Sequence, residues 1–109
     1  MVSYLASRPS RDVIVAGRQQ LTHTWWEGRR PVFDLVISQI VIDEVCAGDP
    51  AAAQRRLAFI ADVPSLDVTA EAAELAAILI ERVPLPVQAA ADAAHMAVAA
   101  VHGIDFLLT

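Results

Sequence analysis

Apolar residues along the chain follow two spacings, one typical of amphipathic helices and one typical of buried strands. Over residues 13–28 they recur three and four positions apart, which predicts a helix that Ser10 caps and that ends near Gly28. Trp25 and Trp26 lie in its last turns. We expect both rings to pack the helix onto the core, with base stacking as the alternative.

The rest of the chain alternates between strand-like and helix-like segments. Short β-branched or apolar runs predict a buried strand at 33–37, a minimal strand at 66–68 and a last strand at 104–109. Helices are predicted over 39–47, over 51–62, from the Thr69 cap to the proline-rich break at 83–86, and over 87–102. The first residues, 1–5, look like loop. This order predicts an α/β fold in which helices flank a small parallel sheet, and residues 1–109 are expected to form a single domain.

Capping residues mark several of these boundaries. Ser38 is predicted to cap the helix over 39–47, and Gly48 to close it. Asp49 is predicted to cap the next helix, with Pro50 in its first turn. Gly103 is predicted to be the C-terminal cap of the last helix. These signals place a tight turn between the third and fourth predicted elements.

Composition narrows the class of protein. Although 56% of the residues are hydrophobic, no apolar run reaches the roughly 18 residues needed to cross a bilayer. Residues 1–5 lack the charged start and apolar core of a signal peptide. The single cysteine, Cys46, excludes an internal disulfide, suits a reducing compartment and is expected to be a small buried residue. We therefore expect a cytoplasmic protein with no membrane segment.

Charge is distributed unevenly. The net charge of −5 argues against a general nucleic-acid binder. All eight basic residues are nonetheless arginine, which can bind phosphates bidentately. An alternative is a compositional bias with solvated helix faces, and Arg55 and Arg56 are expected on such a face. Five arginines lie in the first 30 positions: Arg8, Arg11, Arg18, Arg29 and Arg30.

Two carboxylates occupy unusual positions. The chain contains no glycine-rich phosphate loop, CxxC, HExxH or GxSxG motif. Glu44 lies within two turns of the end of the predicted strand 33–37, at the edge where parallel sheets bind ligands. Asp92 is a lone charge in an alanine-rich helix and would need a partner or a metal ion if buried; it could instead emerge at an exposed edge. His95 lies one turn further on the same face, and is expected to pack rather than to bind zinc.

The segments around these acids resemble a known family. Residues 38–45, Ser-Gln-Ile-Val-Ile-Asp-Glu-Val, followed by Ala-Gly-Asp-Pro, are similar to the second acidic motif of PIN-domain proteins. Residues 90–97, Ala-Ala-Asp-Ala-Ala-His-Met-Ala, and the run 102–109 are similar to the third acidic motif and the strand after it. The resemblance covers the whole chain and is strongest to the VapC-like toxins of bacterial toxin–antitoxin pairs.

The resemblance implies a fold and an activity. Such proteins are three-layer α/β sandwiches that cut RNA with about four acidic residues holding Mg²⁺ or Mn²⁺, which prefer hard oxygen ligands. By position, Glu44 matches the second acid and Asp92 the third, so both are expected to be catalytic metal ligands. Asp105 is expected to be peripheral. RNA is the implied substrate and a cognate antitoxin the implied protein partner.

The sequence also departs from the family pattern. Residues 1–5 resemble only the segment after the family's first acid, and the fourth acidic position normally comes just after a Leu-Leu-Thr like 107–109. We therefore expect a PIN-like domain incomplete at both termini, without the family's first strand. Two alternatives stay open. One is an inactive remnant that binds an antitoxin or a second copy of itself; the other is an unrelated α/β interaction domain with incidental acids.

Overall fold

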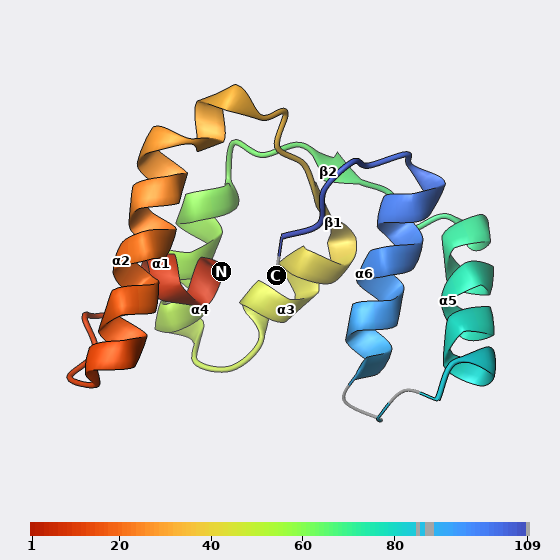
Figure 1. The fold of residues 1–109 in the computed structure, drawn as a ribbon, viewed down its shortest axis with the longest axis horizontal. Helices are drawn as coiled ribbons and strands as arrows, with labels where there is room; N and C mark the ends of the chain where they lie inside the picture. Colours follow the sequence, from red (N-terminus) through yellow and green to blue (C-terminus); the bar gives the residue numbers. More distant parts are fainter. Residues whose placement is uncertain (85, 87–88, 109) are drawn as a thin grey trace. The chain divides into compact units, whose positions relative to one another are not determined.

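Helices make up most of the chain, and two short strands form a parallel sheet (Figure 1). The computed structural model describes residues 1–84, 86 and 89–108. Within it the chain folds as two compact units: unit 1 comprises Met1–Val36 and Ile42–Pro64, and unit 2 comprises Ile37–Val41 and Ser65–Thr109. The predicted mixed α/β class with a small parallel sheet is confirmed at this level. The prediction of a single domain over 1–109 stays a prediction.

The elements follow the predicted order with an additional helix at the start and, among the described residues, without the strand predicted after the last helix. They are α1 (Val2–Ala6), α2 (Val13–Gly28), the 3₁₀ helix η1 (Arg30–Val32), β1 (Ile37–Ser38), α3 (Gln39–Cys46), α4 (Pro50–Ile60), β2 (Ser65–Leu66), α5 (Ala70–Arg82) and α6 (Ala90–Val101). The five predicted helices are present, with ends shifted by at most three residues. Val87 and Gln88, predicted to begin the last helix, lie outside the described residues.

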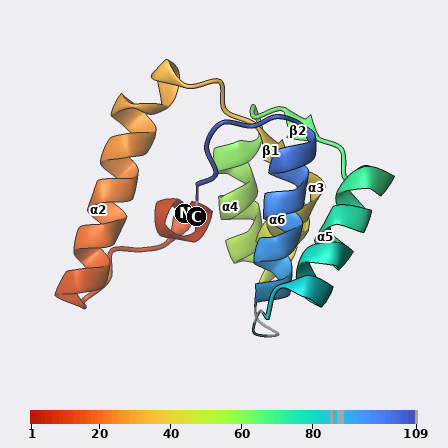
Figure 2. The ribbon, with the colours of Figure 1, turned by 45° about the vertical axis from the view of Figure 1, so that its right-hand side comes forward.

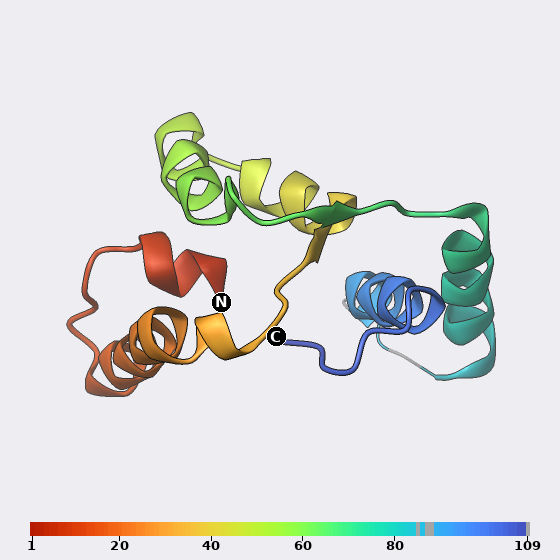
Figure 3. The same ribbon diagram turned by 90° about the horizontal axis from the view of Figure 1, so that it is seen from above.

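The loop predicted at residues 1–5 is wrong, because these residues form α1. The carbonyl of Met1 accepts hydrogen bonds from the N–H groups of Tyr4 and Leu5 at 3.0 and 3.2 Å. α1 lies between α2 and α4 (Figures 2 and 3) and buries Leu5. Such a short helix is marginal on its own, so this tertiary burial is what sustains it.

Unit 1 has a small apolar core. Its buried residues come from α1, α3, α4 and the turn after α4: Leu5, Val45, Ala53, Ile60 and Val63. Trp26 of α2 contacts Phe59 of α4. Their rings meet edge-on, with 6.4 Å between the ring centroids. Trp25 stacks on Phe33 at 5.9 Å. The expectation that the tryptophans pack α2 onto the core is confirmed for Trp26, whereas the ring that Trp25 contacts, Phe33, is exposed.

The start of α2 differs from the prediction in its cap. Asp12, not Ser10, is the N-cap, and its Oδ1 accepts hydrogen bonds from the N–H groups of Ile14 and Val15. The Ser10 hydroxyl instead accepts from the N–H of Asp12. An aspartate two residues later satisfies the helix terminus equally well, because both residue types are favoured N-caps.

The turn between α3 and α4 forms as the sequence predicts. Gly48 has a φ of 85°, a backbone conformation that favours glycine. Asp49 caps α4 by accepting the Ala52 N–H at 2.9 Å. Arg56, predicted to face out, is half-buried: its Nε donates to the Val45 carbonyl and its Nη2 to that of Ala47. The guanidinium thereby satisfies carbonyls at the end of α3, which have no partner within the helix.

Unit 2 contains the sheet and the pair α5 and α6, which lie side by side in Figures 1 and 3. Their contact buries Ala72, Ala93 and Ala97, whose small side chains permit close approach of the helices. Thr69 caps α5 through the Ala72 N–H, as predicted. Gly103 closes α6 with a φ of 66°, and the N–H of Ile104 bonds to the Ala99 carbonyl, as in a Schellman motif.

The strands are shorter than predicted. β1 and β2 pair in parallel, with Ile37 opposite Ser65 and Ser38 opposite Leu66. Residues 33–36 are not strand, since Phe33 is tied to η1 by a bond from its N–H to the Arg30 carbonyl. Residues 104–108 are not strand either; Thr109 lies outside the described residues. The predicted cap Ser38 instead ends β1, and its buried hydroxyl has no hydrogen-bond partner among the described residues.

Candidate functional site

Glu44 lies on α3, which follows β1 directly. Glu44 is exposed, and it belongs to the part of α3 that is in unit 1. The neighbouring Val45 is buried and anchors this turn of α3 in the core. Cys46, expected to be buried, is exposed at the end of the helix. Because successive residues of a helix lie on different faces, Val45 points into the core and the Glu44 carboxylate stays accessible to a solute.

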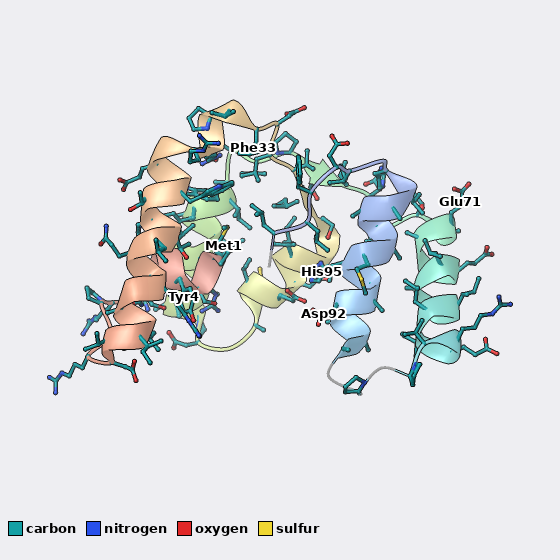
Figure 4. The ribbon with its side chains drawn as sticks, in the orientation of Figure 1. Met1, Tyr4, Phe33, Glu71, Asp92 and His95 are labelled. Carbon is teal, nitrogen blue, oxygen red and sulfur yellow. The ribbon has the colours of Figure 1, made fainter. Side chains whose placement is uncertain are left out.

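Asp92 lies in the first turn of α6, in unit 2, and is exposed. Figure 4 shows its side chain on the same side of α6 as that of half-buried His95, one turn further on. A carboxylate in the first turn interacts favourably with the positive end of the helix dipole. Because Asp92 is exposed, its charge does not require a buried partner or a metal ion, which was one argument for singling it out. Its assignment as a metal ligand stays a prediction.

The two predicted ligands belong to different units, so each is placed only within its own. Among the described residues, no group of three or more His, Cys, Asp or Glu side chains is arranged to hold a metal ion. Asp105, predicted to be peripheral, is exposed in the segment that follows α6. Each unit therefore presents one of the two predicted carboxylates, exposed on a helix whose neighbouring residues include buried ones.

The N-terminal arginines differ in their surroundings. Arg8, Arg11, Arg18 and Arg29 are exposed. Arg30 is not: its guanidinium lies 4.2 Å from the centre of the Trp26 ring, and its Nη2 is 3.1 Å from both carboxylate oxygens of Asp62. The Arg30 side chain is 24% exposed and that of Asp62 is 73% exposed. The aromatic ring and the carboxylate together hold this guanidinium in one orientation.

A surface pocket of about 450 Å³ adjoins this arginine, entirely within unit 1. Its walls include Trp26, Arg30, Phe33, Leu35 and Asp62. Figure 4 shows Phe33 beside the loop that follows η1. In the sequence, Arg29 and Arg30 stand out only as members of the N-terminal set of arginines that could bind phosphates, and this pocket was not predicted. The adjacency of an arginine pair to two tryptophans was the signal that could have indicated it.

Comparison with known proteins found no match: no family model fits the sequence, and neither a curated protein nor a solved structure matches it. Among the described residues, no helix combines the length and apolar character needed to cross a membrane.

Proposed function

We propose that this chain is a PIN-like, VapC-type domain that cleaves RNA with the help of Mg²⁺ or Mn²⁺. The observation that carries the proposal is the position of Glu44, an accessible carboxylate on a helix that begins where a strand of a parallel sheet ends. Ligand sites of parallel α/β proteins form at this edge. The motifs around Glu44 and Asp92 add the family resemblance. A three-layer PIN sandwich, a cognate antitoxin and a cytoplasmic location belong to the same proposal.

The chemistry of the two carboxylates fits the proposed ion. Mg²⁺ takes hard oxygen ligands and keeps several waters, so one or two carboxylates suffice on the protein side. Glu44 and Asp92 are both exposed, which leaves room for such waters. When bound, the ion would activate a water and offset the charge that develops on the phosphodiester. Exposed arginines, Arg29 among them, would contribute contacts to RNA phosphates.

Cleavage of a structured RNA by the purified chain in Mn²⁺ tests this proposal. We expect Glu44→Gln and Asp92→Asn each to lower the cleavage rate at least about tenfold, since changes around a metal centre commonly cost 10–100-fold. Glu74→Gln, on the exposed surface of α5, and Asp67→Asn are matched controls that should cleave like the unchanged protein. Unchanged cleavage by both site variants would refute the assignment of Glu44 and Asp92.

One observation favours a second candidate, a non-catalytic module that binds a protein partner. α2 exposes three apolar side chains: Val13 is 85% exposed, Ile14 68% and Leu21 72%. Exposed apolar faces of this kind often mark protein interfaces. A module of this class would show no heat of Mg²⁺ or Mn²⁺ binding by titration calorimetry. It would also associate with itself or with an antitoxin through α2, and the double variant Ile14→Gln, Leu21→Gln would weaken that association.

A further inference from the structure

The pocket beside Arg30 offers three kinds of contact at one place. Phe33 provides exposed aromatic surface, Arg30 provides N–H donors and is itself held against the Trp26 ring, and Asp62 provides carboxylate acceptors. Its volume of about 450 Å³ lies within the range of about 300–1,000 Å³ for small-molecule pockets. We propose that this pocket binds an unpaired nucleobase of RNA and prefers guanine. The inference rests on the proposed ribonuclease function and adds a substrate preference to it.

Arg30 has donors left for a ligand. Only its Nη2 takes part in the contact with Asp62, and neither Nε nor Nη1 has a hydrogen-bond partner among the described residues. Stacking on Trp26 keeps the guanidinium plane in position. Nε–H and the Nη1 hydrogens lie on different edges of the guanidinium, so the paired donation to guanine O6 and N7 that is typical of arginine would combine Nη1 with the second N–H of Nη2.

Asp62 has acceptors left as well. Both of its oxygens accept from the same Nη2 at 3.1 Å, which leaves the outer lone pairs of each oxygen free for further donors. The side chain is 73% exposed, so a ligand can reach it. Guanine carries two donors, N1–H and N2–H, on the edge next to O6. A carboxylate is complementary to that pair of donors.

The other bases match this donor and acceptor set less well. Adenine offers the acceptor N7 and the donor N6–H on one edge, and so makes one contact with the arginine and one with the carboxylate. Uracil and cytosine also present fewer groups than guanine, and their single rings cover less aromatic surface. Unpaired bases in RNA are commonly held by stacking on aromatic side chains together with hydrogen bonds to their edges. The pocket therefore ranks guanine first.

Binding of nucleoside monophosphates to the unmodified chain tests the proposal. Titration of GMP, AMP, UMP and CMP in the presence of EDTA, followed by tryptophan fluorescence and by the Trp26 indole resonance, gives four dissociation constants free of any metal effect. Because all four carry the same phosphate, its contribution cancels. We expect GMP to bind at least about fivefold more tightly than AMP, the lower limit for one good bidentate contact. Equal binding of GMP and AMP would overturn the proposal.

Two variants with matched controls locate the preference. Asp62→Asn replaces an acceptor by a donor where guanine needs acceptors, so GMP should then bind no better than AMP; Asp67→Asn, an exposed aspartate of unit 2, should keep the preference. Arg30→Lys should weaken GMP binding, whereas Arg55→Lys on α4 should not. Asp62 is mostly exposed, so its replacement preserves the fold. Equal losses in Asp62→Asn and Asp67→Asn would refute a role for Asp62.

The test of guanine binding can fail or succeed independently of the test of the proposed ribonuclease function. Selective GMP binding together with Mn²⁺-dependent cleavage that ignores Glu44 and Asp92 would remove the site assignment and keep the guanine pocket. Cleavage that depends on both acids, without selective GMP binding, would remove the pocket and keep the ribonuclease.

Discussion

Gln19 holds the segment before α2 in place, and its replacement by alanine provides a quantitative test of the unit 1 fold. The side chain amide is buried, with 7% of the residue exposed. Its Oε1 accepts the N–H of Ser10 at 2.9 Å, and its Nε2 donates to the carbonyl of Arg8 at 3.1 Å. Ser10 in turn accepts the N–H of Asp12, the cap of α2. The Gln19 side chain therefore holds the loop that precedes Asp12, the N-cap of α2.

The size of the effect can be worked out from these two bonds. A neutral hydrogen bond contributes about 0.5–1.5 kcal/mol net, and part-buried groups left without partners cost more. Losing both bonds should lower the free energy of unfolding by about 2–3 kcal/mol. Urea unfolding followed by tryptophan fluorescence measures this directly, because both tryptophans lie on α2. The corresponding fall in melting temperature is about 10 °C for a domain of this size.

The neighbouring glutamine supplies the control. Gln20 is exposed, and among the described residues its side chain makes one hydrogen bond, to Thr24, which at 3.5 Å is too long to contribute much. We expect Gln20→Ala to change stability by less than about 0.5 kcal/mol. Glutamate at position 19 should also destabilise, because it keeps the acceptor for Ser10 but places a carboxylate against the Arg8 carbonyl. A Gln19→Ala variant as stable as Gln20→Ala would refute the bridging role.

Five further substitutions have expected outcomes that urea or thermal unfolding can check. Gly17→Ala should stabilise by up to about 1 kcal/mol, since Gly17 is in an exposed helix interior with open space around it, whereas Gly48→Ala should destabilise by about 1 kcal/mol because its φ is 85°; equal effects would contradict this. Arg56→Ala should cost about 1–2 kcal/mol by freeing the Val45 and Ala47 carbonyls, and Arg55→Ala almost nothing; a similar loss in both would show that the carbonyl contacts contribute little. Ser38→Ala should be neutral or stabilising by about 1 kcal/mol, because it removes a buried hydroxyl without a partner among the described residues; clear destabilisation would indicate a bond formed in solution.

Features of the fold set by neighbouring residues could be predicted from the sequence, and features set by distant ones could not. Asp49, Thr69 and Gly103 cap their helices as predicted, because a cap depends on the residue type and a bond within a few positions. The helix at residues 1–5 was missed, since it depends on burying Leu5 against α2 and α4. The strand was predicted to begin too early, at Phe33, because the Phe33 N–H bonds to the Arg30 carbonyl in η1 rather than to a neighbouring strand.

The same distinction applies to the candidate site. Glu44 and Asp92 were identified from the motifs around them, and their exposure is compatible with that assignment without testing it. The pocket was missed because Asp62 lies 32 positions from Arg30 in the chain, and no local pattern reports their contact. The exposure of Val13 and Leu21 was missed for a related reason, since helical spacing identifies an apolar face but not whether another element covers it.

Glu44 and the guanine pocket both lie in unit 1, and kinetics can assign them separate roles. A contact made equally in the bound substrate and in the transition state raises KM when it is lost and leaves kcat unchanged, whereas loss of a group that acts on the reacting phosphate lowers kcat. We therefore expect Asp62→Asn to raise KM for a guanine-containing RNA, with little change for an RNA in which adenine replaces that guanine. Glu44→Gln should lower kcat on both RNAs. Steady-state cleavage of this RNA pair in Mn²⁺ measures all four effects. A fall in kcat in Asp62→Asn would place Asp62 in the chemistry rather than in base recognition.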